Sequence, residues 1–135
     1  MNVFINLCVA DVARSRAFFG ALGFSFNDYF SNEDTLAMRL SDTSFVMMMH
    51  ADKFAGFTPR AIADATQTSE VLTALQLDSR AEVDKMTDAA IANGGSAFRP
   101  PEDHGFMYGR SFCDPDGHVW EPFYYDASTI PEEHR

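Results

Sequence analysis

The sequence predicts an α+β fold in which two tandem β-α-β-β-β modules form a cupped mixed sheet with helices on its convex side. Three observations lead to this prediction. Residues 3–9 alternate between apolar and mixed positions, which is typical of a strand. A helical stripe of apolar residues follows, and the same order of elements returns in the second half. Because one such unit cannot bury its own sheet face, we expect two of them to associate edge to edge.

The first module should span residues 1–52, within a single domain over residues 1–125. After the strand at 3–9, Asp11 can cap a helix that Gly23 ends. Polar turns then separate three extended segments, near Phe24–Phe30, Thr35–Leu40 and Ser44–His50.

A linker over residues 53–69, with a short helix-like segment at Arg60–Ala65, should lead to the second module at 70–125. There Glu70–Asp78 alternates as a strand does, and Ser79 and Glu82 have the spacing of a capping box before a helix. Further extended segments follow, near Ser96–Arg99, Met107–Cys113 and His118–Tyr125, and residues 126–135 form a tail.

The charge balance excludes two classes of partner. Ten Lys and Arg face twenty Asp and Glu in 135 residues, so the net charge is -10. Binding to nucleic acid or to an anionic membrane surface requires a basic face, and we expect neither. No apolar run approaches the roughly 20 residues that span a bilayer, and Met1–Val9 does not resemble a signal peptide. Two cysteines favour a reducing cytoplasm over a disulfide scaffold, so we expect a cytoplasmic protein.

The concave side of the cup is the expected binding site, because small ligands occupy concave surfaces between structural units. The chain also has 13 Phe and 7 Met, side chains that fill a core or line an adaptable pocket. Residues pointing away from the helices should line this side: Phe4, Asn6, Cys8, Leu72, Ala74, Gln76, and on the final strand Val119, Glu121 and Phe123.

Two motifs resemble the vicinal oxygen chelate superfamily of glyoxalases, bleomycin-resistance proteins and extradiol dioxygenases. The first runs from Leu7-Cys8-Val9-Ala10-Asp11 through Phe18-Phe19 to Leu22-Gly23-Phe24, and the second is Asp114-Pro115-Asp116-Gly117-His118-Val119-Trp120-Glu121. The resemblance covers about Met1 to Tyr125 and supports the fold more strongly than any reaction, because one scaffold hosts many chemistries.

The resemblance also implies where a metal would lie. In metal-using members, four side chains converge in the cup, and the matching positions here are Phe4, Met47, Leu72 and Glu121. Only Glu121 is a plausible ligand for a divalent ion, so we expect the inherited metal site to be lost and no cofactor to be needed. A shift of a few residues would bring in His50 in place of Met47, which still gives only two ligands.

The segment from Glu102 to Arg110 is a further candidate, because its His104, Tyr108 and Arg110 lead into the closing hairpin. Arg110 could meet a carboxylate in the cup or pair with a surface acid. His118 is better interpreted as an exposed turn residue, His134 belongs to the tail, and no Gly-rich phosphate loop is present.

Glu121 is the candidate catalytic residue. A carboxylate in an apolar cup should have a raised pKa, unless Arg110, Asn6 or Gln76 compensates its charge, and could act as an acid or base. The same side chain could anchor a ligand by hydrogen bonds, or be a family relic.

Three functions follow in order of preference. The first is metal-independent binding of a small organic molecule by Phe4, Asn6, Met47, Leu72, Gln76, His104, Tyr108 and Arg110. The second is a metal-dependent lyase or isomerase of the lactoylglutathione lyase type that uses Glu121 as ligand or base. The third is a structural or partner-binding scaffold. The resemblance also implies a homodimer, with cups completed across chains.

Overall fold

The computed structural model describes residues 1–135, and its first module is the expected β-α-β-β-β unit. The elements are β1 (Val3–Val9), α1 (Val12–Ala21), β2 (Ser25–Phe26), β3 (Thr35–Arg39) and β4 (Ser44–His50). They form a four-stranded sheet in the order β1-β4-β3-β2, with β1 parallel to β4 and the other pairs antiparallel. The helical crossover from β1 makes that parallel pair possible.

The second module repeats this plan with a longer helix and more numerous strands, several of them only two or three residues long. Its elements are β5 (Leu72–Gln76), α3 (Arg80–Ala92), β6 (Ser96–Ala97), β7 (Glu102–Asp103), β8 (Met107–Gly109), β9 (Phe112–Cys113) and β10 (Val119–Tyr125). Strand β5 pairs in parallel with β10, which lies beside β8 and β9. The segment predicted as one extended piece at Met107–Cys113 is therefore two strands, and β7 lies in a segment for which no strand was predicted.

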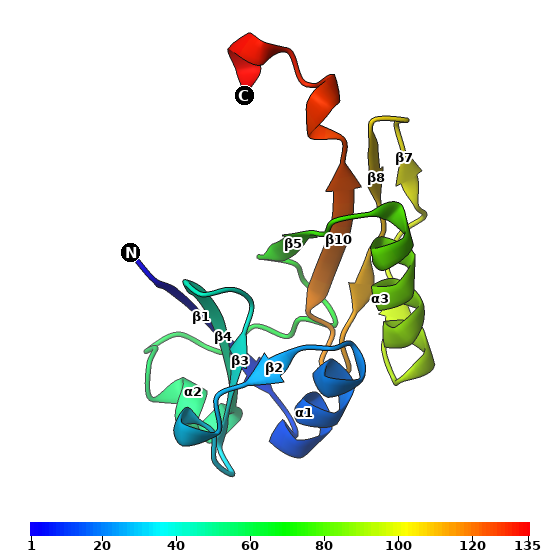
Figure 1. The fold of residues 1–135 in the computed structure, drawn as a ribbon. Coiled ribbons are helices and arrows are strands. Elements are labelled where there is room, and N and C mark those ends of the chain that lie inside the picture. Colours follow the sequence, from blue (N-terminus) through cyan, green and yellow to red (C-terminus); the bar gives the residue numbers. More distant parts are fainter.

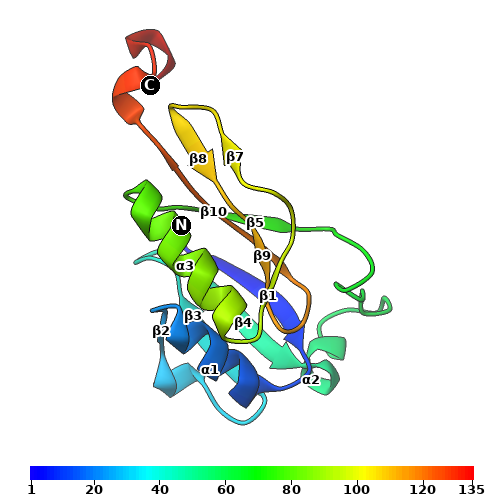
Figure 2. The same ribbon diagram turned by 90° about the vertical axis from the view of Figure 1, so that its right-hand side faces the viewer.

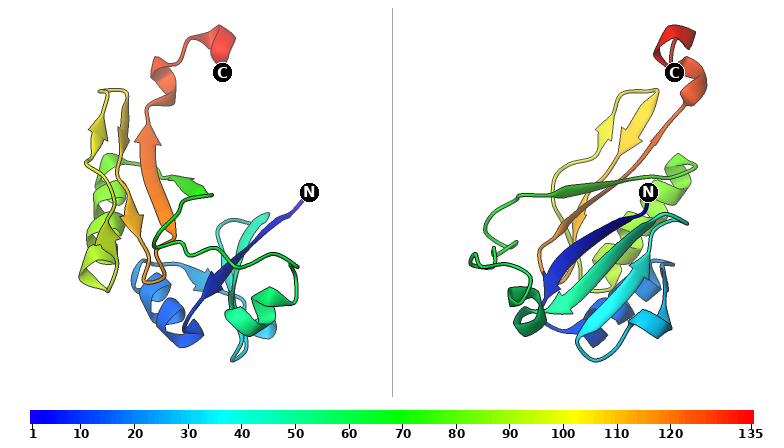
Figure 3. Two further views of the ribbon diagram at one scale, coloured as in Figure 1. Left: turned by 180° about the vertical axis from the view of Figure 1, so that it is seen from behind. Right: turned by 90° about the vertical axis from the view of Figure 1, so that its left-hand side faces the viewer.

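Both long helices lie on the same side of the two sheets, as Figures 1 and 2 show. The opposite faces of the sheets are free of helices α1 and α3, which gives the expected cupped face with helices outside it. Figure 3 shows the last ten residues extending beyond the second module, where they form the short turns η2 (Ala127–Thr129) and η3 (Glu132–His134).

One hydrophobic core joins the modules. Trp120 of β10 is fully buried, and its ring meets that of Phe19 of α1 edge-on, with 5.1 Å between centroids. An edge-on aromatic pair is a favourable arrangement that adds to the area buried. The core contains residues from both modules: Val9, Phe18, Phe19, Leu36, Met38, Val46, Met48, Ala90, Phe112 and Trp120. The two modules therefore form one unit.

The helix boundaries follow the predicted signals. The Asp11 side chain accepts a hydrogen bond from the Arg14 amide, and Gly23 has the positive φ of 95° that glycine tolerates. Ser79 likewise caps α3, because its hydroxyl accepts from the Glu82 amide. The other half of the capping box differs: the Glu82 carboxylate accepts from the amide of Asp78, not from that of Ser79.

Two local predictions are wrong. The linker has no helix at Arg60–Ala65, and a short helix α2 (Ala51–Ala55) directly follows β4 instead. The side chain of Asp64 accepts bonds from the amide and hydroxyl of Thr66, and such a turn competes with a helix. The segment near Phe24–Phe30 is extended only at β2, because Asn27 caps the turn η1 (Asp28–Phe30) through the Tyr29 amide.

None of the helices combines the length and the apolar character needed to cross a bilayer.

Candidate functional site

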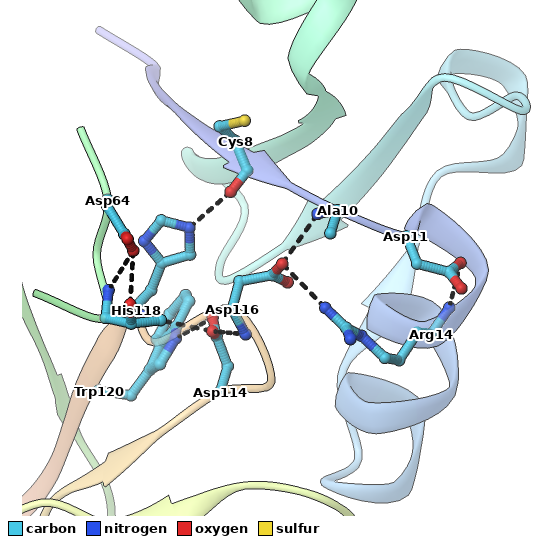
Figure 4. Close-up of polar contacts among 10 residues, drawn as sticks. Cys8, Ala10, Asp11, Arg14, Asp64, Asp114, Asp116, His118 and Trp120 are labelled. Atoms are coloured by element: carbon cyan, nitrogen blue, oxygen red, sulfur yellow. Dashed lines mark hydrogen bonds and ion pairs between the residues drawn. The ribbon is translucent and has the colours of Figure 1, made fainter. Parts of the chain in front are cut away.

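The closing turn of module two is fastened to the first strand of module one (Figure 4). Asp116 accepts hydrogen bonds from the Ala10 amide at 2.8 Å and from Nη2 of Arg14 at 2.9 Å. His118 Nε2 lies 2.7 Å from the Cys8 carbonyl oxygen. The interpretation of His118 as an exposed turn residue is therefore wrong: it is half-buried and bonds the free edge of β1.

Asp114 organises this turn from within. It is buried and accepts hydrogen bonds from the Trp120 indole at 3.0 Å and from the amides of Asp116 and His118. Burial raises the pKa of Asp114, and the nearby His118 opposes that shift. Gly117 completes the turn with a φ of 90°, and a side chain there would collide with Thr66 of the linker. The Asp-Pro-Asp-Gly motif thus joins the modules structurally.

The open face of module two contains an ion pair. Glu121, whose side chain is 15% exposed, is paired with the guanidinium of Arg99. This pair lines a cavity of about 210 Å³. The other lining residues include the small residues Ala74 and Gly109 and the ring of Phe123. The partner of Glu121 is thus Arg99, whereas Arg110, Asn6 and Gln76 were the predicted partners.

Arg99 lies in a segment that the sequence analysis treated only as extended. Its amide donates to the Ser111 hydroxyl at 3.1 Å, and its Nε lies 3.6 Å from a Glu102 carboxylate oxygen. His104 Nε2 is 3.6 Å from the other oxygen of Glu102. The only available signal for Arg99 was its place at the end of the short extended segment Ser96–Arg99, and spacing could not show which face it would reach.

The side chains of Tyr108 and Arg110 extend toward α3. The Tyr108 hydroxyl donates to Asp84 at 2.6 Å, and Nη1 of Arg110 donates to both Asp84 and Asp88. The hydrogen bond from Tyr108 is the largest influence lowering the pKa of Asp84. For Arg110, the surface-acid alternative is therefore the one that the structure shows.

A second ion pair holds the β7–β8 hairpin against the start of α3. Arg80 bonds both oxygens of Asp103, at 2.9 and 2.6 Å, and its guanidinium lies over the Tyr108 ring, 4.8 Å from the centroid. The contact with Arg80 holds the pKa of Asp103 far below its usual range. This hairpin carries Glu102, so these contacts also position the acidic side of the cavity.

The open face of module one is aromatic and sulfur-rich. Phe4 is 57% exposed and stacks on Phe45 of β4, with 4.9 Å between the ring centroids. Next along the same face, Asn6 lies opposite Met47. Cys8 follows, and burial is the larger cause that raises the pKa of its thiol, with the charge of Asp116 adding to it.

The strand registers relate the two open faces. Phe4 pairs with Phe45 as Leu72 pairs with Val119, and Asn6 pairs with Met47 as Ala74 pairs with Glu121. Met47 and Glu121 therefore hold equivalent positions in the two repeats. His50 is three residues beyond Met47, so it has the opposite parity on β4, and its side chain caps α2.

These positions do not fit a divalent metal. Phe4 and Leu72 have no donor atom, the Met47 thioether is too soft for ions that prefer oxygen or imidazole, and Glu121 is engaged by Arg99. No three His, Cys, Asp or Glu side chains lie in a group that could hold a metal ion. A single carboxylate is insufficient for a stable site.

A second cavity, of about 180 Å³, lies where the two modules meet. Asn6 and Cys8 line it from β1, Val71 and Thr73 from the start of module two, and His118 from the closing turn. Leu72 and Gln76, which were predicted to bind ligand, are exposed on β5 outside this cavity.

Comparisons with known proteins agree with paired β-α-β-β-β modules around an open face. The hypothetical protein SA1046 from S. aureus is 25% identical, with a TM-score of 0.77 over 92% of this chain and 91% of that one. A glyoxalase-related enzyme from Fulvimarina pelagi is 20% identical, with a TM-score of 0.78 over 92% of this chain and 87% of that one. The fosfomycin resistance protein FosX from Listeria monocytogenes is also 20% identical, with a TM-score of 0.65 over 93% of each chain.

The family model for the Glyoxalase/Bleomycin resistance protein/Dioxygenase superfamily matches residues 3–121. The chain therefore belongs to this superfamily, as the two sequence motifs indicated. No curated protein matches the sequence. The two structures at 20% identity show the shared fold alone, so the chemistry of this chain must be argued from its own residues.

Proposed function

We propose that the cupped face binds a small organic molecule and does so without a divalent metal. The observation that carries this proposal is the composition of the four positions where the resemblance places metal ligands. Three of them are apolar, and the fourth, Glu121, is paired with Arg99. A ligand would meet aromatic and thioether surface on one module and an ion pair on the other.

The predicted residues divide into two groups under this proposal. Phe4, Asn6 and Met47 supply contacts from module one, and Leu72 and Gln76 supply the β5 edge. Glu121 anchors the ligand in module two. His104 is placed beside the cavity by its contact with Glu102, one of the lining residues. Arg110 lines the cavity itself, and the contacts of Tyr108 and Arg110 with α3 fix the hairpin beside it.

The proposed assembly is a homodimer. Val3 at the start of β1 and Val71 just before β5 are about half exposed, and a second copy of the chain would cover them. Exposed apolar surface of this kind often marks an interface. Sedimentation equilibrium should give about twice 15.0 kDa, and a monomer at every concentration would contradict the proposal. A cytoplasmic location stays a prediction, consistent with the free thiols of Cys8 and Cys113.

Elemental analysis is the decisive test of the binding site. Untagged protein purified without chelator should contain far less than one equivalent of Zn, Ni, Mn or Fe, while a panel of flat aromatic compounds should include some that raise its melting temperature. A full equivalent of metal, together with turnover lost in Glu121→Gln, would favour the lyase or isomerase instead. No stabilising compound and a neutral Glu121→Gln would favour the scaffold.

A further inference from the structure

We infer that Arg99 and Glu121 together recognise the edge of an uncharged amide or lactam group, which is the polar part of the ligand. This inference rests on the proposed binding function and adds the chemical class of the ligand. The observation behind it is an ion pair with a single contact, in the lining of a cavity, that leaves one guanidinium nitrogen and one carboxylate oxygen without a partner.

The unused atoms follow from the contacts of the two side chains. Nη2 of Arg99 bonds Oε2 of Glu121, and Nε of Arg99 faces Glu102 at 3.6 Å. The structure gives Nη1 of Arg99 and Oε1 of Glu121 no hydrogen-bond partner. A guanidinium has five N–H donors and a carboxylate has two acceptor oxygens, so the pair offers a donor and an acceptor to the same ligand.

The charges around this pair favour a neutral ligand. Arg99 and Glu121 cancel, and Glu102 and Arg110, which also line the cavity, carry opposite charges. A carboxylate on the ligand would face Glu102 and Glu121, in a chain of net charge -10, while both guanidiniums of the lining already pair with acids of the chain. An ammonium or amidinium would lie against a Glu121 that Arg99 already neutralises. An amide carries both a carbonyl acceptor and an N–H donor without net charge.

The cavity also suits a flat body attached to that polar edge. Its volume is about 210 Å³, and a cavity of about 150 Å³ is enough for benzene. Ala74 and Gly109 leave space beside the ion pair, while Met107 and Phe123 present apolar surface. A ligand group that leaves the largely buried Glu121 carboxylate without a hydrogen-bond donor loses that bond, and this cost gives the pair its selectivity.

Three probes of nearly identical shape test the inference: benzamide, benzoate and benzamidine, which are neutral, anionic and cationic. Each is titrated into ¹⁵N-labelled full-length protein, and amide shifts are followed at Arg99, Gly109 and Glu121. We expect benzamide to bind at these positions, about tenfold more tightly than either charged probe.

Variants then assign the effect to the ion pair. Arg99→Met and Arg99→Lys should each weaken benzamide binding about tenfold, since the lysine keeps the charge but loses the planar fork. Arg16→Met is the matched control. Arg16 is in an ion pair with Asp28, as Arg99 is with Glu121, and its side chain is 44% exposed against 40% for Arg99. It should leave binding unchanged.

Four results would overturn the inference. They are tighter binding of benzoate, tighter binding of benzamidine, no shift at Arg99, Gly109 and Glu121 with any probe up to its solubility limit, and benzamide binding that is insensitive to both Arg99 variants. If other aromatic compounds then shift the amide resonances of Phe4 and Met47, the proposed binding function stands and only the assignment of the ligand as an amide fails. A full equivalent of bound metal would reject both.

Discussion

The two open faces of this protein have the same backbone plan and different chemistry. Met47 and Glu121 are equivalent by strand register, yet one belongs to an apolar face with stacked Phe4 and Phe45, and the other to an ion pair with Arg99. The repeat therefore determines where a side chain points but not what it does. Binding chemistry is set by side chains grafted on the shared frame.

The closing turns differ in the same way. In module one, residues 41–43 form an exposed turn in which Asp42 pairs with Arg39. In module two, Asp114 is buried and Asp116 bonds the backbone of β1. Only the second turn joins the modules, so equivalent acidic residues should have unequal effects on stability. The following predictions test both contrasts.

The largest expected effect is that of Asp114→Ala. It leaves the buried Trp120 indole and two turn amides without their acceptor, which should lower the free energy of unfolding by about 3 kcal/mol. Asp42→Ala is the control in the equivalent turn and should change stability by less than about 0.5 kcal/mol. Urea denaturation measures both, and similar effects would remove the contrast between the turns.

Arg99→Met should lower the free energy of unfolding by about 1–2 kcal/mol, because it leaves the largely buried Glu121 carboxylate without a counter-ion. The double variant Arg99→Met/Glu121→Met copies the apolar chemistry of module one and should regain wild-type stability or exceed it. Thermal and urea unfolding of the single and double variants test this. A double variant less stable than Arg99→Met would show that the pair itself stabilises the fold.

Phe4→Ala should have a smaller effect on stability, about 0.5–1 kcal/mol, through loss of the stacked contact with Phe45. Phe57 is the control, because it is exposed and has no aromatic partner, and Phe57→Ala should be nearly neutral. The same pair of variants, titrated with any aromatic compound that stabilises the wild type, should show weaker binding only for Phe4→Ala. Equal binding by both would place the ligand away from the face of module one.

The smallest effect should be that of pH through the Arg80–Asp103 contact. The folded-state pKa of Asp103 is depressed, so its stabilising contribution is present above the unfolded pKa of about 4 and is lost as pH falls below it. Asp103→Asn should therefore be less stable than wild type at pH 7, and the difference should become smaller as pH falls from 4 to 2. Urea titrations of both proteins between pH 7 and pH 2 measure this difference, and a difference that does not change with pH would contradict the prediction.

Much of the fold could be predicted because its signals are local. Alternation identified β1 and β5, and capping residues at Asp11 and Ser79 marked the starts of both long helices. The prediction of a linker helix at Arg60–Ala65 failed because the short side chain of Asp64 accepts from the amide and hydroxyl of Thr66, a competition that apolar patterning does not reveal.

The sequence by itself determined the repeated unit, the family and the side chains of the open faces, since period-2 patterning decides which residues share a face. Only the tertiary structure decided their partners. Arg99 meets Glu121 from 22 residues away, Arg110 joins α3, and His118 bonds the β1 edge. Such pairings depend on how separate strands and helices pack, and a long flexible side chain can reach several acids or carbonyls that the sequence does not rank.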